Sequence, residues 1–248
     1  MSADVAGDSD VLALLTEAKL TARGFLANAS NHTLLVQVGD DDDSRTHAIY
    51  KPRTGERPLW DFPPGTLCRR EVAAYVVSRF LGWDLVPPTV LRDGPMGFGS
   101  VQLFVDHDPD RHYFVLVDEQ RYTRELARIA TFDLLVNNAD RKGSHILVGE
   151  DDGRLYGIDH GVTFHAEPKL RTVVWDLGPA PIEPGWRDAL ARLADALLDP
   201  GRDITASLCD LLSPREVETL RLRATALTRT AALPVVDERR RPYPWPPL

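Results

Sequence analysis

The sequence predicts an α+β fold in which a strand-rich N-terminal half is followed by a helix-rich C-terminal half. Two observations predict it. Up to about residue 105, apolar and β-branched residues form short runs bounded by turn residues, which is typical of strands. Beyond that point the apolar residues recur at helical spacing. We therefore expect two lobes, residues 10–105 and residues 106–235, with residues 1–9 and 236–248 as disordered or extended tails.

The first elements of the N-terminal half are a helix and three strands. Residues 11–26 begin with a helical apolar period and turn extended near Leu20. Residues 32–38 and 46–52 are rich in apolar and β-branched side chains and predict two strands. The acidic run Asp40–Asp43 between them predicts a solvated hairpin loop.

A helix and two further strands complete this half. Residues 65–83 place apolar side chains at helical spacing, with Thr66 able to cap the start and Gly82 able to end the helix. Residues 89–94 and 99–106 predict two strands around a Gly/Pro turn.

The C-terminal half is predicted to be helical around one short hairpin. Residues 118–138 form a long amphipathic pattern, and residues 145–159 predict the hairpin. Helical residues run from about 186 to 227, and Ser213 and Glu216 suit the N-cap and capping-box positions of the last helix.

The large aromatic residues are expected to be structural. We predict that four tryptophans pack in the core or between the lobes. They are Trp60, Trp83, Trp175 and Trp186. The Pro-rich, basic tail is expected to be extended, with Trp245 as the residue through which it can pack back.

Composition limits the classes of function. The 248 residues carry a net charge of −8, whereas nucleic acid and anionic membranes are bound by basic surface. Two cysteines are too few for a disulfide framework, which favours a reduced compartment. The N-terminus lacks the pattern of a signal peptide, and no apolar run reaches the ~20 residues of a spanning helix. We expect a cytoplasmic protein with no nucleic-acid partner and no stable membrane insertion.

Lys51 closes a predicted strand between apolar residues, so part of its stem is expected to be buried. A buried ammonium requires an anionic partner, and Glu71 on the following helix is the obvious one. The alternative is a surface lysine at a strand end, because lysine is rarely buried.

Two carboxylates also follow predicted elements. Asp140 comes directly after the long helix, and Asp159 follows the apolar end of a strand. Carboxylates at the ends of neighbouring elements can converge on one cleft, where one orients a hydroxyl and the other holds a hard divalent cation. The alternative is a turn role, since Asp and Gly both favour turns.

The order of these residues is that of a kinase. There, a strand lysine holds phosphates, a helix glutamate holds the lysine, a loop aspartate aligns the acceptor hydroxyl, and a last aspartate holds metal. Phosphoryl transfer depends on positioning and on neutralising charge, which explains the need for cations and metal ligands around one cleft. The predicted bilobal, protein-kinase-like layout agrees with this order.

Five segments, in order, resemble the phosphatidylinositol 3/4-kinase superfamily, most closely its type II phosphatidylinositol 4-kinase-like branch and the small actinobacterial phosphatidylinositol kinase-like proteins. The segments are IYKP (49–52), GSVQLFVD (99–106), NNADRKGSHILV (137–148), GIDHGVTF (157–164) and VVWDLGPAPIEP (173–184). Together they span most of residues 20–185.

The resemblance implies a role for each matching residue. Lys51 would contact the phosphates of ATP, with Glu71 as its partner. Asp140 would be the catalytic-loop aspartate, Arg141 its usual neighbour, and Asp159 the metal-binding aspartate. The hinge that faces adenine would comprise Gln102, Leu103, Phe104 and Val105.

His145 departs from the family pattern, because it stands where the catalytic loop has a metal-binding asparagine. A neutral imidazole can ligate a divalent ion but suits transition metals better than Mg²⁺. We therefore expect Mg²⁺ or Mn²⁺ as cofactor, with Mn²⁺ preferred. The alternative is that His145 only packs in the loop and donates a hydrogen bond.

A second departure concerns the membrane. The eukaryotic type II enzymes carry a palmitoylated, cysteine-rich stretch after the nucleotide lysine, where this chain has only Cys68. One acyl chain anchors marginally. A lipid substrate is therefore not expected.

The loop that would cover the phosphates is predicted at Ser30 and Asn31, between two strands. Small polar residues there can expose backbone amides that form an anion nest. The alternative is a plain hairpin turn.

The resulting hypothesis is an ATP-dependent phosphotransferase that uses a divalent metal and acts on an unknown protein or small-molecule acceptor. One alternative keeps the fold but holds the nucleotide reversed and transfers AMP. Another is a nucleotide-binding pseudokinase that acts by docking a partner, with His145 marking altered metal chemistry.

Overall fold

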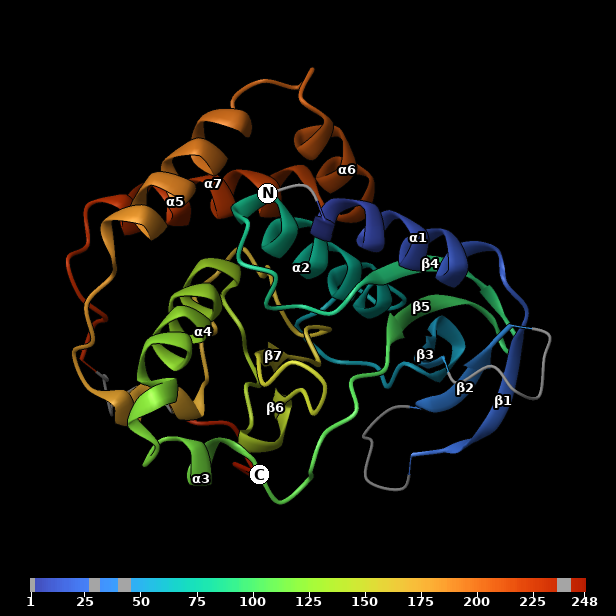
Figure 1. Cartoon of the computed structure of the whole chain (residues 1–248). Coiled ribbons are helices and arrows are strands. Elements are labelled where there is room, and N and C mark those ends of the chain that lie inside the picture. Colours follow the sequence, from blue (N-terminus) through green and yellow to red (C-terminus); the bar gives the residue numbers. More distant parts are fainter. Residues whose placement is uncertain (1–2, 27–31, 40–45, 236–241) are drawn as a thin grey trace.

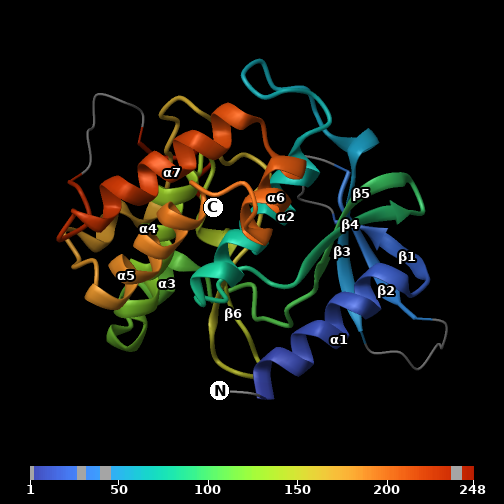
Figure 2. The same cartoon turned by 90° about the horizontal axis from the view of Figure 1, so that it is seen from above.

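The computed structural model describes residues 3–26, 32–39, 46–235 and 242–248. Figure 1 shows an antiparallel sheet on one side and a group of helices on the other, and Figure 2 shows the same division from above. The predicted α+β, bilobal kinase-like architecture is confirmed. The acidic run Asp40–Asp43 lies outside the described residues.

The sheet of the N-terminal lobe has the strand order β1-β2-β3-β5-β4, and each neighbouring pair is antiparallel. Its strands are β1 (Leu20–Phe25), β2 (Leu34–Val38), β3 (His47–Pro52), β4 (Thr89–Gly94) and β5 (Gly97–Leu103). Alternate residues of β3 are buried, as expected for a strand with one face on the core. This alternation places Lys51 on the face opposite to Tyr50, which is fully buried.

Two helices belong to this lobe, α1 (Ala3–Glu17) and α2 (Leu67–Leu81). α1 begins at Ala3, so most of the predicted N-terminal tail is helical. Gly82 ends α2 in the left-handed conformation, as predicted, with φ 66°.

The predicted N-cap of α2 is wrong. The Thr66 hydroxyl turns back to donate to the carbonyl of Pro63 at 2.7 Å. The free amide of Cys68 donates instead to the Glu56 carboxylate at 2.9 Å. A side chain from the preceding loop thus takes the role that the local sequence assigns to Thr66.

The C-terminal lobe contains five α-helices and a short hairpin in the part of the chain described. They are α3 (Tyr113–Leu116), α4 (Thr123–Val136), β6 (Ile146–Val148), β7 (Leu155–Gly157), α5 (Pro184–Ala196), α6 (Asp203–Leu211) and α7 (Pro214–Thr228). The predicted capping box of α7 is confirmed, because Ser213 and Glu216 each accept from the other's backbone amide. α4 and α5 are amphipathic, and their apolar sides form the main core with the end of α2.

The tryptophan prediction holds in part. Trp83 and Trp186 are buried and their ring centroids lie 6.1 Å apart. Trp60 is 90% exposed, so its assignment to the core is wrong. It lies in a proline-rich loop outside the core, with the Lys169 ammonium 4.7 Å from its ring centroid.

The C-terminal tail packs on the second lobe, but not through Trp245, which is 89% exposed. Its backbone makes the contacts. The carbonyl of Pro242 accepts from the Thr172 amide and the Trp175 indole, and the carbonyl of Pro247 accepts from the Gly143 amide at 2.8 Å. The helices in the described part of the chain are all too short or too polar to span a lipid bilayer.

Candidate functional site

Lys51 lies at the centre of a partly buried ionic cluster between the lobes. Its ammonium contacts the Glu71 carboxylate on α2 and lies 2.8 Å from Asp159 Oδ1, which follows β7. The second Glu71 oxygen accepts from the His160 amide at 2.9 Å. The pairing of Lys51 with Glu71 that the sequence suggests is present, and Asp159 joins it.

The cluster is held together by charge. Burial alone would lower the pKa of Lys51, but the carboxylates of Asp159 and Glu71 outweigh it and raise that pKa above its ordinary value. Burial likewise acts to raise the pKa of Asp159, yet the Lys51 ammonium holds it well below its usual range. Lys51 and Asp159 are therefore both charged at neutral pH.

Asp159 has an unusual backbone. Its φ is 57°, in the left-handed region that non-glycine residues seldom adopt. Such conformations concentrate at functional sites because the surrounding contacts must hold them. Here the amide of the next residue, His160, is fixed on Glu71, and this contact helps to aim the Asp159 carboxylate at Lys51.

Arg141 forms the scaffold of the predicted catalytic loop. Its fully buried guanidinium pairs with Asp133 of α4, also fully buried, with 3.1 Å between Nη2 and Oδ1. The same guanidinium donates to the carbonyls of His145 and Ile158 and contacts Nε2 of His160. It therefore joins α4, the loop and the segment of Asp159, and it lies out of reach of a substrate.

Asp140 lies beside this scaffold. Its amide donates to the Asn138 side chain, and its carboxylate lies 3.6 Å from the Lys142 ammonium. Burial, opposed by Lys142, raises the pKa of Asp140 to about 6. A carboxylate with this pKa is ionised at neutral pH and still basic enough to attract a hydroxyl proton.

His145 stands between Asp140 and Asp159. Its Nδ1 lies 3.1 Å from the Asp140 carbonyl oxygen, and its Nε2 lies 3.3 Å from Asp159 Oδ2. Burial lowers the pKa of His145 to about 4, so the ring is neutral. When Nδ1 carries the proton and donates to the Asp140 carbonyl, the Nε2 lone pair faces the same side as the Asp159 carboxylate.

These two groups fit one divalent ion. Two ligands that each lie about 2.1 Å from an ion and at right angles are about 3.0 Å apart, close to the separation of Nε2 and Oδ2. In the described part of the chain, no group of three or more His, Cys, Asp or Glu side chains could hold a metal. Any ion held by these two side chains would therefore need further ligands from water or from a bound molecule.

A cavity of about 510 Å³ opens beside the cluster. Its wall includes Lys51, Asp159, His145, Lys142 and the predicted hinge 102–105. This volume is that of a small-molecule site. Asp140 is not part of the wall and lies next to Lys142, one of the residues that form it.

The hinge segment is already partly bonded. The Leu103 amide donates to the Pro88 carbonyl at 2.8 Å, and the Phe104 amide donates to the His47 carbonyl at 3.0 Å. The Gln102 side chain donates to Thr89, and the Val105 carbonyl contacts His107 Nδ1. The hydrogen bonds of Leu103 and Phe104 fix the hinge against the sheet.

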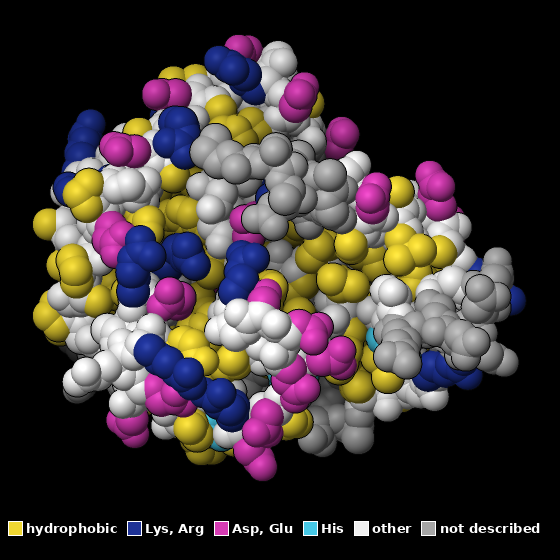
Figure 3. Space-filling model, in the orientation of Figure 1, with side chains coloured by type: hydrophobic (Ala, Val, Ile, Leu, Met, Phe, Trp, Pro, Cys, Tyr) yellow, Lys and Arg dark blue, Asp and Glu magenta, His cyan; other side chains and the backbone are white. Residues whose placement is uncertain are grey.

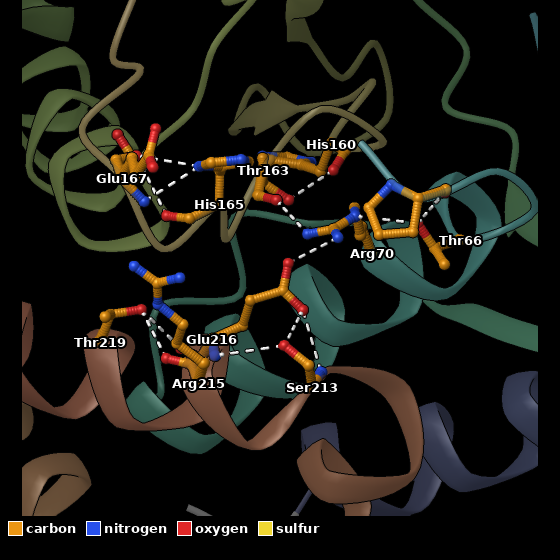
Figure 4. A network of polar contacts seen from close by, with 12 residues as sticks. Thr66, Arg70, His160, Thr163, His165, Glu167, Ser213, Arg215, Glu216 and Thr219 are labelled. Carbon is orange, nitrogen blue, oxygen red and sulfur yellow. Dashed lines mark hydrogen bonds and ion pairs between the residues drawn. The ribbon is translucent and has the colours of Figure 1, made fainter. Parts of the chain in front are cut away.

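A second buried network ties α2 to the segment after Asp159. Figure 4 shows the Arg70 guanidinium between the Thr163 carbonyl and the Glu216 carboxylate, at 2.6 Å from each. The Thr163 hydroxyl donates to the His160 carbonyl at 2.6 Å. Arg70 thereby connects α2, the Asp159 segment and α7.

Sequence reasoning missed this network and the scaffold of Arg141. Asp133 and Arg70 are charged residues on the apolar sides of helices, which is the signal that would have revealed them. Lys142 carries no such signal. The predicted residues Ser30 and Asn31 lie outside the described residues.

Comparison with known proteins decides the family. Residues 89–184 match the sequence model described as phosphatidylinositol 3- and 4-kinase. The chain is 40% identical over 270 residues to Protein Rv2133c of Mycobacterium tuberculosis (strain ATCC 25618 / H37Rv), covering 96% of this chain and 95% of that protein. This chain belongs to the phosphatidylinositol 3- and 4-kinase-like superfamily. It is also 31% identical over 182 residues to phosphatidylinositol 4-kinase gamma 4 of Oryza sativa subsp. japonica, across 65% of this chain and 32% of that protein.

Solved structures support the kinase-like fold of this superfamily member. The Golgi casein kinase with Mn/ADP bound aligns with a TM-score of 0.62 at 14% identity, over 92% of this chain and 76% of that one. The hydra Fam20 structure with sugar gives 0.59 at 15% identity, over 93% and 89%. The Helicobacter pylori proinflammatory kinase CtkA gives 0.51 at 14% identity, over 88% and 94%. Identities this low speak for the fold alone.

Proposed function

We propose that this superfamily member is an ATP-dependent phosphotransferase that uses a divalent metal ion. The observation that carries the proposal is the Lys51 ammonium, held at once by Glu71 and Asp159 on the wall of a 510 Å³ cavity. A kinase needs this cluster, because the lysine must be fixed where the phosphates lie and the aspartate must be ionised to hold metal.

The nucleotide would lie with adenine against the hinge and its phosphates toward Lys51. The amides of Leu103 and Phe104 are engaged by the sheet, so the Val105 amide is the donor that we assign to the base. Leu147 and Ile158, also on the wall, would pack against the ring from the second lobe. The Mn/ADP complex of the Golgi casein kinase, which has a similar fold, supports nucleotide in such a cleft.

Metal would be held by Asp159 and His145. When bound, a divalent ion neutralises charge on the phosphates. This role suits the residues present, since both side chains face the cavity and the imidazole is neutral.

Asp140 would align the acceptor hydroxyl. The acceptor oxygen forms a bond to the γ-phosphorus, the bond from that phosphorus to the ADP oxygen breaks, and the hydroxyl proton passes to Asp140. Lys142, 3.6 Å from Asp140, is placed to attract the transferred phosphoryl group. Arg141 would keep Asp140 and His145 in place without touching the substrate.

The acceptor would be a hydroxyl of a protein or a small molecule. In Figure 3, basic and acidic side chains are intermingled over the face shown, without a continuous basic field. With a net charge of −8, the chain is poorly suited to an anionic membrane surface.

Mass spectrometry of the protein and nucleotide after incubation with ATP and Mn²⁺ or Mg²⁺ tests the proposal. We expect ADP and an added phosphoryl group, on the chain or on a supplied acceptor, and loss of both in Asp140→Asn and Asp159→Asn. Asp188→Asn, an exposed aspartate of α5, is the matched control and should keep full turnover. Attached AMP would favour a reversed nucleotide. ATP binding without any product, with either metal, would contradict catalysis and favour a pseudokinase.

A further inference from the structure

A second hollow of about 530 Å³ lies where the turn after α2, the start of α4 and the β6–β7 turn meet. It shares no lining residue with the nucleotide cavity. Its charged lining residues are Asp84, Arg121, Arg124, Glu125, Arg128 and Arg154. Four arginines around one hollow are notable in a chain whose net charge is −8.

Two of these arginines already have partners. Arg124 forms a two-bond pair with Glu183 at 2.6 and 2.8 Å, and Arg121 pairs with Glu119 at 2.7 Å. The Asp84 carboxylate is also engaged, because it pairs with Arg79 at 3.1 Å. These contacts engage the carboxylates of Glu183, Glu119 and Asp84, whereas Glu125 stays beside Arg128.

Arg128 and Arg154 form no ion pair within the described residues. The Arg154 guanidinium makes one hydrogen bond, to the Asp84 carbonyl at 3.3 Å, and lies over the Tyr156 ring, 5.6 Å from its centroid. Arg128 Nε is buried without a hydrogen-bond partner in the described part of the chain. Burial lowers the pKa of Arg128, Glu125 opposes the shift, and the neighbouring cations Arg124 and Arg154 add to it. The Arg128 and Arg154 guanidiniums therefore line the hollow without an ion pair, beside the carboxylates of Glu125 and Asp84.

Glu125 Oε2 is also buried without a hydrogen-bond partner among the described residues. A carboxylate in this position requires a donor, just as the guanidinium requires an acceptor. A ligand that satisfies both needs a compact anionic group and a neighbouring hydroxyl. Guanidinium groups match phosphate oxygens with paired N–H donors, and the hollow has the volume of a small metabolite.

We propose that this hollow binds a small phosphate monoester whose body carries hydroxyl groups, as a sugar phosphate does. Arg128 and Arg154 take the phosphate, and Glu125 accepts from a hydroxyl. Because the site shares no lining residue with the nucleotide cavity, the ligand can bind while that cavity is occupied.

The site adjoins the elements that place the candidate catalytic cluster. Asp84 follows α2, which carries Glu71, and the Gly157 amide just before Asp159 donates to the Leu85 carbonyl at 2.8 Å. A ligand that bridges Arg128 and the α2 turn would thus contact both lobes.

Isothermal titration of the full chain with glucose 6-phosphate tests the inference, with a non-hydrolysable ATP analogue filling the nucleotide cavity. Inorganic phosphate and uncharged glucose are the comparison ligands. We expect saturable binding of glucose 6-phosphate, weaker binding of phosphate and none of glucose. Arg128→Gln and Arg154→Gln should each weaken it at least tenfold, whereas Arg192→Gln, an exposed arginine of α5, should not change it.

Two results would overturn the inference. The first is no binding of glucose 6-phosphate, or equal binding in the Arg128→Gln variant. The second is loss of binding in Lys51→Ala, which would put the phosphate in the nucleotide cavity.

Discussion

The buried pair of Arg70 and Glu216 gives the sharpest prediction on stability. The Arg70 side chain is 1% exposed and that of Glu216 is 11% exposed, and their charged atoms lie 2.6 Å apart. We choose Glu216→Gln as the perturbation, because glutamine keeps the size of the side chain and its capping of α7 while removing the charge. The variant leaves a buried guanidinium without its counter-ion.

The expected cost is about 3 kcal/mol, the lower end of the range for removing one partner of a buried ion pair. For a chain of this size, that cost corresponds to a fall in Tm of about 6–12 °C. Thermal and urea unfolding followed by circular dichroism measure both quantities. Glu218→Gln is the matched control, because Glu218 pairs with Arg221 on the exposed side of the same helix and should contribute little.

The pH dependence has a defined sign. Burial acts to raise the pKa of Glu216, but Arg70 and the Ser213 bonds outweigh it, so the folded pKa lies below the ordinary value. The stabilisation is therefore complete above the unfolded pKa of about 4.3 and is lost as the pH falls through the folded value. The gap between wild type and Glu216→Gln should shrink below about pH 4.

Two results would refute this reasoning. One is a Tm for Glu216→Gln no lower than that of Glu218→Gln. The other is a double variant, Arg70→Met with Glu216→Leu, that is less stable than Glu216→Gln alone. Replacing both charges by apolar groups removes the uncompensated guanidinium, so the double variant should recover part of the loss.

Three further predictions concern the site. Asp140→Asn should raise the ligand-free Tm at pH 7 in EDTA, because burial raises the Asp140 pKa to about 6 and so disfavours the ionised carboxylate in the folded state. The gain in Tm should vanish near pH 4, where the carboxyl is protonated in both states. An unchanged Tm at pH 7 would contradict this prediction. Nucleotide binding should be tighter with Mn²⁺ than with Mg²⁺, and His145→Asn should reverse this order. Titration of nucleotide binding with both ions measures the two affinities. Equal affinity with Mg²⁺ and Mn²⁺ in the wild type would contradict a metal-binding role of His145. Truncation after residue 241 should lower kcat more than it raises the KM for ATP, because the Pro242 carbonyl accepts from the Thr172 amide and the Pro247 carbonyl accepts from the Gly143 amide. Steady-state kinetics measures both constants, and an unchanged kcat would show that the tail is dispensable.

Much of the fold could be predicted because its signals are local. Short β-branched runs, helical spacing, the αL residue Gly82 and the capping box of Ser213 and Glu216 each depend on neighbours in the sequence. The cap of α2 was mispredicted because the local sequence alone points to Thr66. Glu56, which replaces Thr66, acts from a loop whose path the local pattern does not encode.

The residues of the candidate site likewise fall into those that the sequence predicts and those that it does not. Lys51, Glu71 and Asp159 were predicted to converge because their order along the chain is that of a known arrangement, and the structure places them in contact. The burial of Arg141 and the link from Arg70 to α7 depend on packing between distant segments. A single sequence shows such residues only as charges on apolar helix faces.

A crystal structure with Mn²⁺ and a non-hydrolysable ATP analogue would show how the cavity holds a nucleotide. We expect adenine at the Val105 amide, phosphates on Lys51, an ion between His145 and Asp159, and the γ-phosphate facing Asp140. A reversed nucleotide whose α-phosphate faces Asp140, or an analogue bound outside the 510 Å³ cavity, would contradict this expectation.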